Sequence, residues 1–292
     1  MIPLQLFQVI RESFCQDEYI SIGSEVNKNP VATEELLELC ADAALDGVSL
    51  VVIDNDTEEV TAVAFNKIQC AAALYTFLRV RLHGQSGISS GLYRRTAIQP
   101  GVVAAVIYGQ FRPQRDANKH YLLQVKPGDT SEKPFFEIFA EQRCTQGSSR
   151  SLIQFMANVD ERCNLFQKYD VDCSLEIMFL ATLKEHRYKK LGFYLCKYSI
   201  EVAKNYKSAI SEMTVDDMGA QYRHIKPRQP FSEVPKICQA IWTSIGSQNI
   251  GKALDFTVHL TVPLSEFVFN GQTYAERLGQ PDAYCEVAAY RL

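Results

Sequence analysis

The sequence predicts an α/β fold, a twisted mixed β-sheet with helices on both faces. Stretches of helical periodicity alternate along the chain with apolar, β-branched runs, as in layered α/β domains. The run Leu175–Leu183 is almost continuously apolar, which is typical of a central strand with both faces covered. At 292 residues, 47% of them hydrophobic, the chain can bury a substantial core. We therefore expect one domain over residues 1–292.

Local patterns predict the first elements. Apolar residues recur at helical spacing in 4–14 and 33–44, which indicates two amphipathic helices. Two β-branched runs, 48–53 and 60–65, flank the polar turn 54–59 and indicate a hairpin. Because the first helix begins so close to Met1, we expect a first strand that is short or absent.

The second half follows the same logic. Helical spacing predicts a helix over 191–206 and another over 234–254. Two strand-like runs, 256–262 and 284–292, end the chain. Together with the central run, these elements complete the expected α/β layers.

Residues 70–124 depart from this pattern. They carry seven Lys or Arg but one acidic residue, Asp116, and show no long amphipathic period. We interpret them as an insertion outside the core sheet. A functional basic arm is an alternative, and so is an intron retained in the gene model.

Composition narrows the class of protein. The formal net charge of −4 gives no reason to expect nucleic acid as a partner, and no apolar run approaches the ~20 residues of a membrane helix. The first residues do not resemble a secretory signal. Nine cysteines occur without a C-x-x-C pair, which favours reduced thiols in a cytoplasmic protein over a metal site or disulfides.

A basic turn follows the central run. Arg187, Lys189, Lys190 and Gly192 lie in this turn and at the start of the next helix. A helix N-terminus offers unpaired N–H groups and the positive end of the dipole, so added cations favour a phosphate or pyrophosphate. An ordinary strand–turn–helix with a solvated basic turn is the alternative.

The segment 187–192, Arg-Tyr-Lys-Lys-Leu-Gly, resembles the R/Q-x-x-G-x-G/A acetyl-CoA motif of the GCN5-related N-acetyltransferases (GNAT). Within that superfamily the chain most resembles the insect arylalkylamine N-acetyltransferases. Three more stretches match in the family's order: 14–19 resembles its F-F-x-D-E-P-L, 47–66 its second and third strands, and 254–267 its L-G-F…I-P-Y-S-D-Y ending. The resemblance implies a GNAT fold with six to seven strands, and a monomer.

The resemblance also implies an activity, the acetyl-CoA-dependent acetylation of a small primary amine by direct attack in a ternary complex, without a metal. Backbone groups of Leu180, Ala181 and Thr182 would pair with the pantetheine. The pyrophosphate would lie on the turn and helix start, which comprise Arg187, Tyr188, Lys189, Lys190, Leu191 and Gly192. Lys190 replaces a motif glycine, and its side chain would either crowd the phosphates or add a favourable charge. We expect it to take helical φ/ψ at the helix start and to weaken rather than abolish binding.

Glu18 matches the family's general base. Such a base is needed because alkylamines are protonated at neutral pH. A solvated helix end formed by Asp17 and Glu18 is the alternative. Ser247 matches a serine that would pass a proton to the CoA thiolate, and Thr243, expected one helical turn away on the same face, would support it. Packing hydroxyls are the alternative for both.

Three departures keep a second function open. Tyr19 replaces the family's proline, and Lys190 and Asp255 replace glycines. These changes allow a degenerate acetyltransferase that binds CoA without turnover and serves a regulatory or scaffolding role. The amine is also open, since an aromatic amine would need an aromatic pocket and a polyamine would need carboxylates. The resemblance places both Tyr206–Tyr222 and the acidic pair Asp216–Asp217 near the acceptor pocket.

Overall fold

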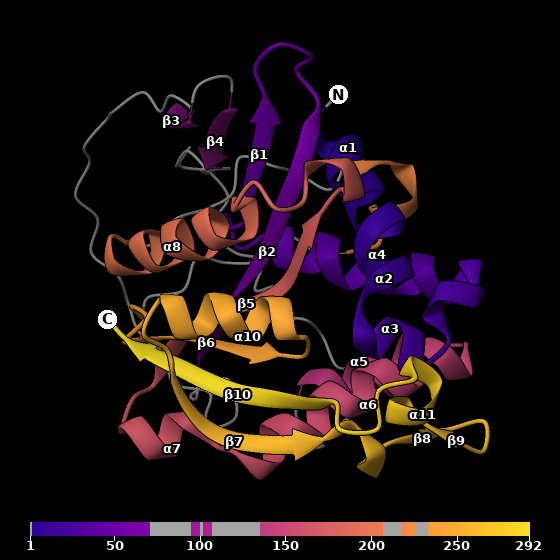
Figure 1. Cartoon of the computed structure of the whole chain (residues 1–292). Coiled ribbons are helices and arrows are strands. Elements are labelled where there is room, and N and C mark those ends of the chain that lie inside the picture. Colours follow the sequence, from indigo (N-terminus) through magenta and orange to yellow (C-terminus); the bar gives the residue numbers. More distant parts are fainter. Residues whose placement is uncertain (1, 71–94, 100–101, 107–134, 207–217, 226–232) are drawn as a thin grey trace, which may run out of the picture.

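The computed structural model describes residues 2–70, 95–99, 102–106, 135–206, 218–225 and 233–292 (Figure 1). Its helices are α1 (Ile2–Val9), α2 (Cys15–Asp17), α3 (Tyr19–Gly23), α4 (Pro30–Ala44), α5 (Phe135–Gln142), α6 (Gly147–Arg162), α7 (Leu165–Tyr169), α8 (Leu191–Lys204), α10 (Ile245–Ala253) and α11 (Tyr274–Leu278). Its strands are β1 (Leu50–Asp54), β2 (Val60–Cys70), β3 (Arg95–Gln99), β4 (Val102–Val106), β5 (Cys173–Thr182), β6 (Ile237–Trp242), β7 (Thr257–Pro263), β8 (Val268–Phe269), β9 (Gln272–Thr273) and β10 (Tyr284–Arg291).

One mixed sheet organises the described chain. Its strand order is β3-β4-β1-β2-β5-β6-β10-β7, and the β8–β9 hairpin forms a separate pair. Every neighbouring pair is antiparallel except β5 and β6, which are parallel. The prediction that 175–183 is a central strand is confirmed, because β5 lies between β2 and β6.

Helices cover both faces of the sheet, as predicted. Alternate residues of β1 enter different cores: Leu50 and Val52 pack with α8, whereas Val51 and Ile53 pack with α1, α4 and α6. In Figure 1, α8 and α10 lie in front of the sheet. The carboxyl ends of β5 and β6 therefore lie between the two layers of helices.

The predicted helices over 4–14, 33–44 and 191–206 are confirmed with small shifts. The first continues through a π-helical segment, Ile10–Phe14, into α2. The second begins earlier, at Pro30, because Asn29 caps the N–H groups of Val31 and Ala32, and proline suits the first helical position.

The prediction of one helix over 234–254 is wrong. Residues Ile237–Trp242 form β6, and only Ile245–Ala253 are helical. A short apolar run fits either a strand or a buried helix, and here pairing with β5 and β10 decides for the strand. Ser244 then caps α10 and marks its start.

The segment 70–124 contributes two strands to the sheet. β3 and β4 pair with each other, and β4 pairs with β1 from Leu50↔Val106 to Asp54↔Val102. The prediction that all of this segment lies outside the sheet is therefore wrong for these strands, because a valine-rich run satisfies the backbone groups at the β1 edge. Residues 71–94, 100–101 and 107–124 lie outside the described residues, as does the burial of the β4 side chains. The described chain begins directly with α1, so no strand precedes it there.

Candidate active site

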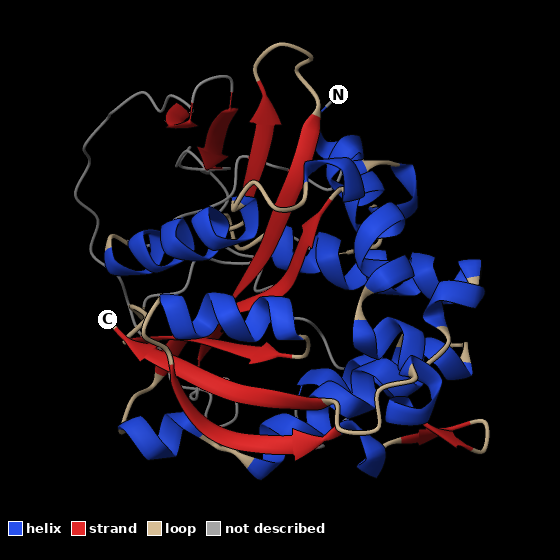
Figure 2. Cartoon of the chain, in the orientation of Figure 1, coloured by secondary structure: helices blue, strands red, loops and turns tan. Residues whose placement is uncertain are grey.

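The parallel strands β5 and β6 separate at the centre of the sheet. They pair only from Ser174↔Ile237 to Glu176↔Gln239. β5 then continues to Thr182 along β2, and β6 continues to Trp242 along β10. A bulge at Met178 shifts the β2–β5 register just beyond this point. Figure 2 shows the result: β1, β2 and β5 rise steeply, whereas β6, β10 and β7 run across the view.

The inner edge of β5 offers backbone groups to this opening. The N–H of Leu183 bonds to Thr61 of β2. Since backbone groups alternate in direction along an antiparallel strand, those of Ala181 also face β2, and those of Leu180 and Thr182 face the opening. The carbonyl of Thr182 already accepts hydrogen bonds from Ser13 Oγ (2.8 Å) and Arg187 Nε (3.2 Å). Leu180 is thus the member of the predicted trio with both groups directed to the opening.

The basic turn joins β5 to α8, and hydrogen bonds from Arg187 hold the turn in place. Its guanidinium also donates to Ser13 Oγ at 3.0 Å and to Asp17 Oδ2 at 2.7 Å. Arg187 therefore ties the turn to the segment that carries Glu18 rather than extending into solvent. The side chains of Tyr188, Lys189 and Lys190 are exposed, and Lys189 Nζ lies 3.4 Å from His186 Nδ1.

Glu18 begins α3 and faces the end of β6. Its Oε2 accepts the N–H groups of Ile20 (2.7 Å) and Ser21 (2.9 Å), which caps the helix. Its Oε1 accepts the hydroxyl of Thr243 at 2.6 Å. Burial raises the pKa of Glu18 above its ordinary value, and the hydrogen bonds from Thr243 and the helix start lower it in part. The alternative of a solvated helix end does not describe this carboxylate, which is part-buried and bonded on both oxygens.

Thr243 and Ser247 do not share a helix face. Thr243 lies between β6 and the N-cap of α10, so the expected helical-turn relation is wrong. Ser247 forms a capping box with Ser244: its hydroxyl donates to the Ser244 carbonyl at 2.9 Å and accepts the Ser244 N–H at 3.1 Å. The structure thus brings Thr243 to Glu18 and places Ser247 at the start of α10.

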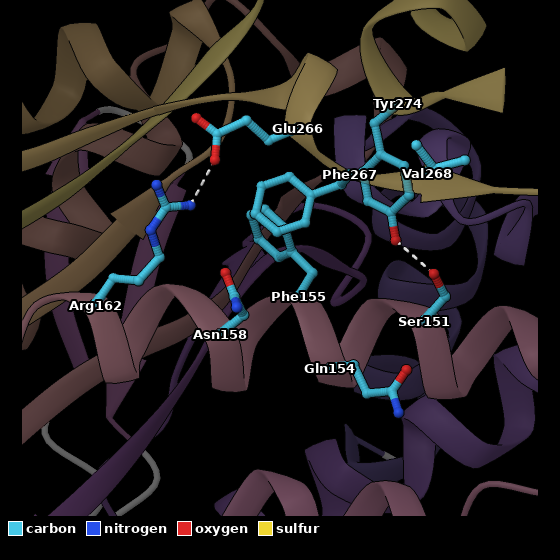
Figure 3. Close-up of a pocket in the computed structure, with 9 residues that line it drawn as sticks. All are labelled: Ser151, Gln154, Phe155, Asn158, Arg162, Glu266, Phe267, Val268 and Tyr274. Carbon is cyan, nitrogen blue, oxygen red and sulfur yellow. Dashed lines mark hydrogen bonds and ion pairs between the residues drawn. The ribbon is translucent and has the colours of Figure 1, made fainter.

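Two cavities lie on the same part of the described structure, and the smaller one includes Tyr19 in its lining. The larger, about 440 Å³, lies between α6 and the stretch 266–274 (Figure 3). It holds a 2.8 Å hydrogen bond between the Ser151 and Tyr274 hydroxyls and a 2.8 Å ion pair between Arg162 and Glu266. The smaller, about 220 Å³, is lined by Tyr19, Ile245, Gln248, Gln280, Pro281, Asp282, Ala283 and Tyr284. Tyr19, which lines the smaller cavity, directly follows Glu18 in the chain, but the Glu18 side chain itself is not part of the lining.

Solved structures of three proteins share this architecture along nearly the whole chain. Arylalkylamine N-acetyltransferase 2 from Aedes aegypti superposes with a TM-score of 0.56 at 15% identity, over 98% of this chain and 93% of that one. A polyamine N-acetyltransferase from Drosophila melanogaster gives 0.58 at 10% identity, over 99% and 95%. An agmatine N-acetyltransferase gives 0.57 at 10% identity, over 99% and 94%. The chain has the GNAT fold. No protein-family model and no curated protein matches its sequence.

Two residues that stand where the resembled motifs have glycine adopt a backbone conformation that glycine favours. Lys190 has φ +59° and Asp255 has φ +59°, so both occupy the left-handed region in which glycine is favoured. The expectation of ordinary helical φ/ψ at Lys190 is therefore wrong. Asp255 follows the C-cap of α10, where its N–H bonds to the Lys252 carbonyl and the next N–H, of Phe256, bonds to the Gly251 carbonyl. Both residues therefore adopt a backbone conformation that glycine takes easily, and this costs conformational free energy for a residue with a side chain.

Replacing Lys190 by glycine is expected to stabilise the chain. Relief of the left-handed conformation, about 1–2 kcal/mol, exceeds the added entropy of the unfolded chain, about 0.5–1 kcal/mol. Urea denaturation should give a free energy of unfolding higher by roughly 0.5–1 kcal/mol. Lys189→Gly is the matched control, because Lys189 is not in the left-handed region, and it should lower stability. Equal losses in both variants would contradict the prediction.

Several features of the site had no sequence signal. Arg187 and Asp17 lie 170 residues apart, and Thr243 and Glu18 lie 225 apart, so only the fold joins them. Tyr206 and Tyr222 are buried in different cores on opposite faces of the sheet, so these two rings do not line one pocket. Residues 207–217 of the segment expected near the acceptor pocket, with Asp216 and Asp217, lie outside the described residues. Among the described residues no cluster of His, Cys, Asp or Glu is placed to hold a metal ion.

Proposed function

We propose that the protein is an acetyl-CoA-dependent N-acetyltransferase that acetylates a small primary amine, with Glu18 as the general base. The observation that carries the proposal is a part-buried carboxylate, held by Thr243 at the end of β6, beside the opening between β5 and β6. A glutamate with a raised pKa is suited to accept a proton from an ammonium group near neutral pH.

Acetyl-CoA would enter between β5 and β6. The N–H and C=O of Leu180 would pair with a pantetheine amide. The first turn of α8, which begins at Leu191, would receive the pyrophosphate on its N–H groups, and Lys190 would add positive charge. Gly192 lets α8 approach α10, since a Cβ there would lie 3.1 Å from Ile250 Cδ1. The mutual approach of these helices supports a compact phosphate site.

The reaction would proceed in one ternary complex. Glu18 takes a proton from the ammonium group, directly or through water, and the neutral amine attacks the thioester carbonyl. The new C–N bond forms and the C–S bond breaks. Glu18 passes the first proton to solvent, and the second proton that the nitrogen loses reaches the CoA thiolate. Ser247 remains the candidate donor for that last proton, although its hydroxyl also stabilises the start of α10.

The amine would occupy the smaller cavity. Tyr19 and Tyr284 supply aromatic surface there, and Asp282 supplies one carboxylate for a cation. A lining with two aromatic rings and one carboxylate favours an aromatic monoamine over a polyamine, which would need a negative charge for each amino group. The nine cysteines are free of disulfides, which fits a cytoplasmic enzyme, and we propose that it acts as a monomer.

The proposal is tested by release of the CoA thiol with tryptamine, dopamine, agmatine and putrescine. We expect turnover, with kcat/KM higher for the two aromatic amines. Binding of acetyl-CoA without thiol release from any amine would overturn the enzyme assignment and favour the degenerate, regulatory alternative. Turnover confined to agmatine and putrescine would keep the enzyme but reject the aromatic pocket.

Thr243→Val is expected to move the pH profile of this reaction. The variant loses the hydroxyl that lowers the pKa of Glu18, so the acidic limb of kcat/KM should shift to higher pH. At pH about 7, kcat/KM should fall roughly threefold to tenfold. Thr243→Ser keeps the donor and should retain the original profile. Coincident profiles for the valine and serine variants would show that this hydroxyl does not tune Glu18.

A further inference from the structure

Two cysteines face each other at the end of the β2–β5 ladder that is far from the active site. Cys70 ends β2 and Cys173 begins β5, and the two residues are direct cross-strand partners. Their sulfur atoms lie 3.6 Å apart, although 103 residues separate them in the chain. We propose that Cys70 and Cys173 are an oxidation site at which a small-molecule disulfide produces an intrachain disulfide between β2 and β5.

Accessibility distinguishes this pair from the other thiols. All nine cysteines lie within the described residues, and Cys70 is partly exposed whereas the other eight are buried. The Cys70 thiol and burial raise the pKa of Cys173, which keeps it a neutral thiol. Cys70 is therefore the residue that an oxidant in solution reaches, and Cys173 is the neighbour that resolves the product.

The chemistry balances with glutathione disulfide as the oxidant. The thiolate of Cys70 attacks one glutathione sulfur, the S–S bond breaks, and one glutathione thiolate leaves. Cys173 attacks the Cys70 sulfur and expels the second glutathione, whose departing thiolate takes up the Cys173 proton. The two protein thiols are oxidised to one disulfide, and glutathione disulfide is reduced to two thiols.

The position of the Cys70–Cys173 disulfide determines how it affects stability and activity. It closes the ladder three residues from Glu176, where β5 still pairs with β6, whereas the active-site end of β5 is at Thr182. A cross-link over such a long separation restricts the unfolded chain strongly. The oxidised protein should therefore resist unfolding while acetyl transfer, if present, stays unchanged.

The test is peptide mapping without reduction after treatment of the folded chain with glutathione disulfide. We expect a Cys70–Cys173 linked peptide and a Tm raised by roughly 5–10 °C. Cys173→Ala should stop at a glutathione adduct on Cys70, because the resolving thiol is gone. Cys70→Ala, a change at a partly exposed position, should give neither product. Cys163→Ala is the matched control and should keep the link.

Three results would overturn the proposal. The unsubstituted chain could stop at the glutathione adduct on Cys70, Cys70 could stay unmodified, or another pair of cysteines could link. Thermal unfolding of each variant before treatment confirms that it is folded. Cys70→Ser provides a second folded variant if Cys70→Ala is unstable.

Discussion

Replacing Glu18 by glutamine is expected to lower kcat roughly 10²–10⁴-fold while the Kd for acetyl-CoA hardly changes. Glutamine has the same size, and its carbonyl oxygen can still accept the N–H groups of Ile20 and Ser21. It cannot take a proton from an ammonium group. Pre-steady-state thiol release with a good amine measures the rate of the chemical step. Equilibrium binding measures the Kd for acetyl-CoA. Near-normal turnover would reduce Glu18 to a helix cap.

The pH dependence of kcat/KM provides a second test of the same variant. In the unsubstituted protein the acidic limb of kcat/KM should lie above the ordinary glutamate pKa of 4.5, because burial raises the pKa of Glu18. In Glu18→Gln this limb should disappear. A limb that persists unchanged would assign the titration to another group.

The stability of the folded chain should depend on pH with the opposite sign from that given by a surface carboxylate in an ion pair. The folded chain binds the Glu18 proton more tightly than the unfolded chain, since the folded pKa is raised. The contribution of Glu18 to stability therefore falls as pH rises from 4.5 through the raised pKa, and Glu18→Gln removes this fall. At neutral pH the variant should unfold at a Tm no lower than the parent, which also shows that lost activity is not lost folding.

The parts of the fold that the sequence predicts correctly are those with a strong local signal. The continuous apolar run that became β5 and the periodic apolar face of α8 each fix their own structure. The strand Ile237–Trp242 was missed because six residues without alternation do not distinguish a strand from a helix. β3 and β4 were missed because basic, small residues surround them in the chain.

The candidate site shows the same division. The resemblance placed Glu18 and the basic turn, both of which the fold brings to the open end of β5 and β6. It could not show that Arg187 binds Asp17, or that Thr243 binds Glu18, because contacts over 170 and 225 residues depend on the whole fold. The left-handed backbone of Lys190 was also hidden, since a lysine side chain does not favour that region, whereas aspartate, as at Asp255, adopts it more readily.

Gly251→Ala is expected to lower both stability and turnover. A Cβ at Gly251 would lie 2.3 Å from Nε1 of Trp242, whose indole is 2% exposed and packs against Phe256 at 5.3 Å between ring centroids. The ring must shift, which costs about 1–3 kcal/mol and lowers the Tm by roughly 2–4 °C for each kcal/mol. Because Thr243 directly follows Trp242, the shift should loosen the Thr243–Glu18 hydrogen bond and reduce kcat.

Gly246→Ala is the matched control for this prediction. It lies in the same helix, α10, but a Cβ there meets only Ser244 Oγ at 3.9 Å, so the change should be neutral or stabilise the helix by about 0.5–1 kcal/mol. Adding Trp242→Phe to Gly251→Ala should restore part of the lost Tm, because the smaller ring leaves room for the methyl group. Thermal unfolding and kcat are measured on all three variants. If Gly251→Ala matches Gly246→Ala in both, the glycine is not required by the indole, and the proposed path from Trp242 to Glu18 fails.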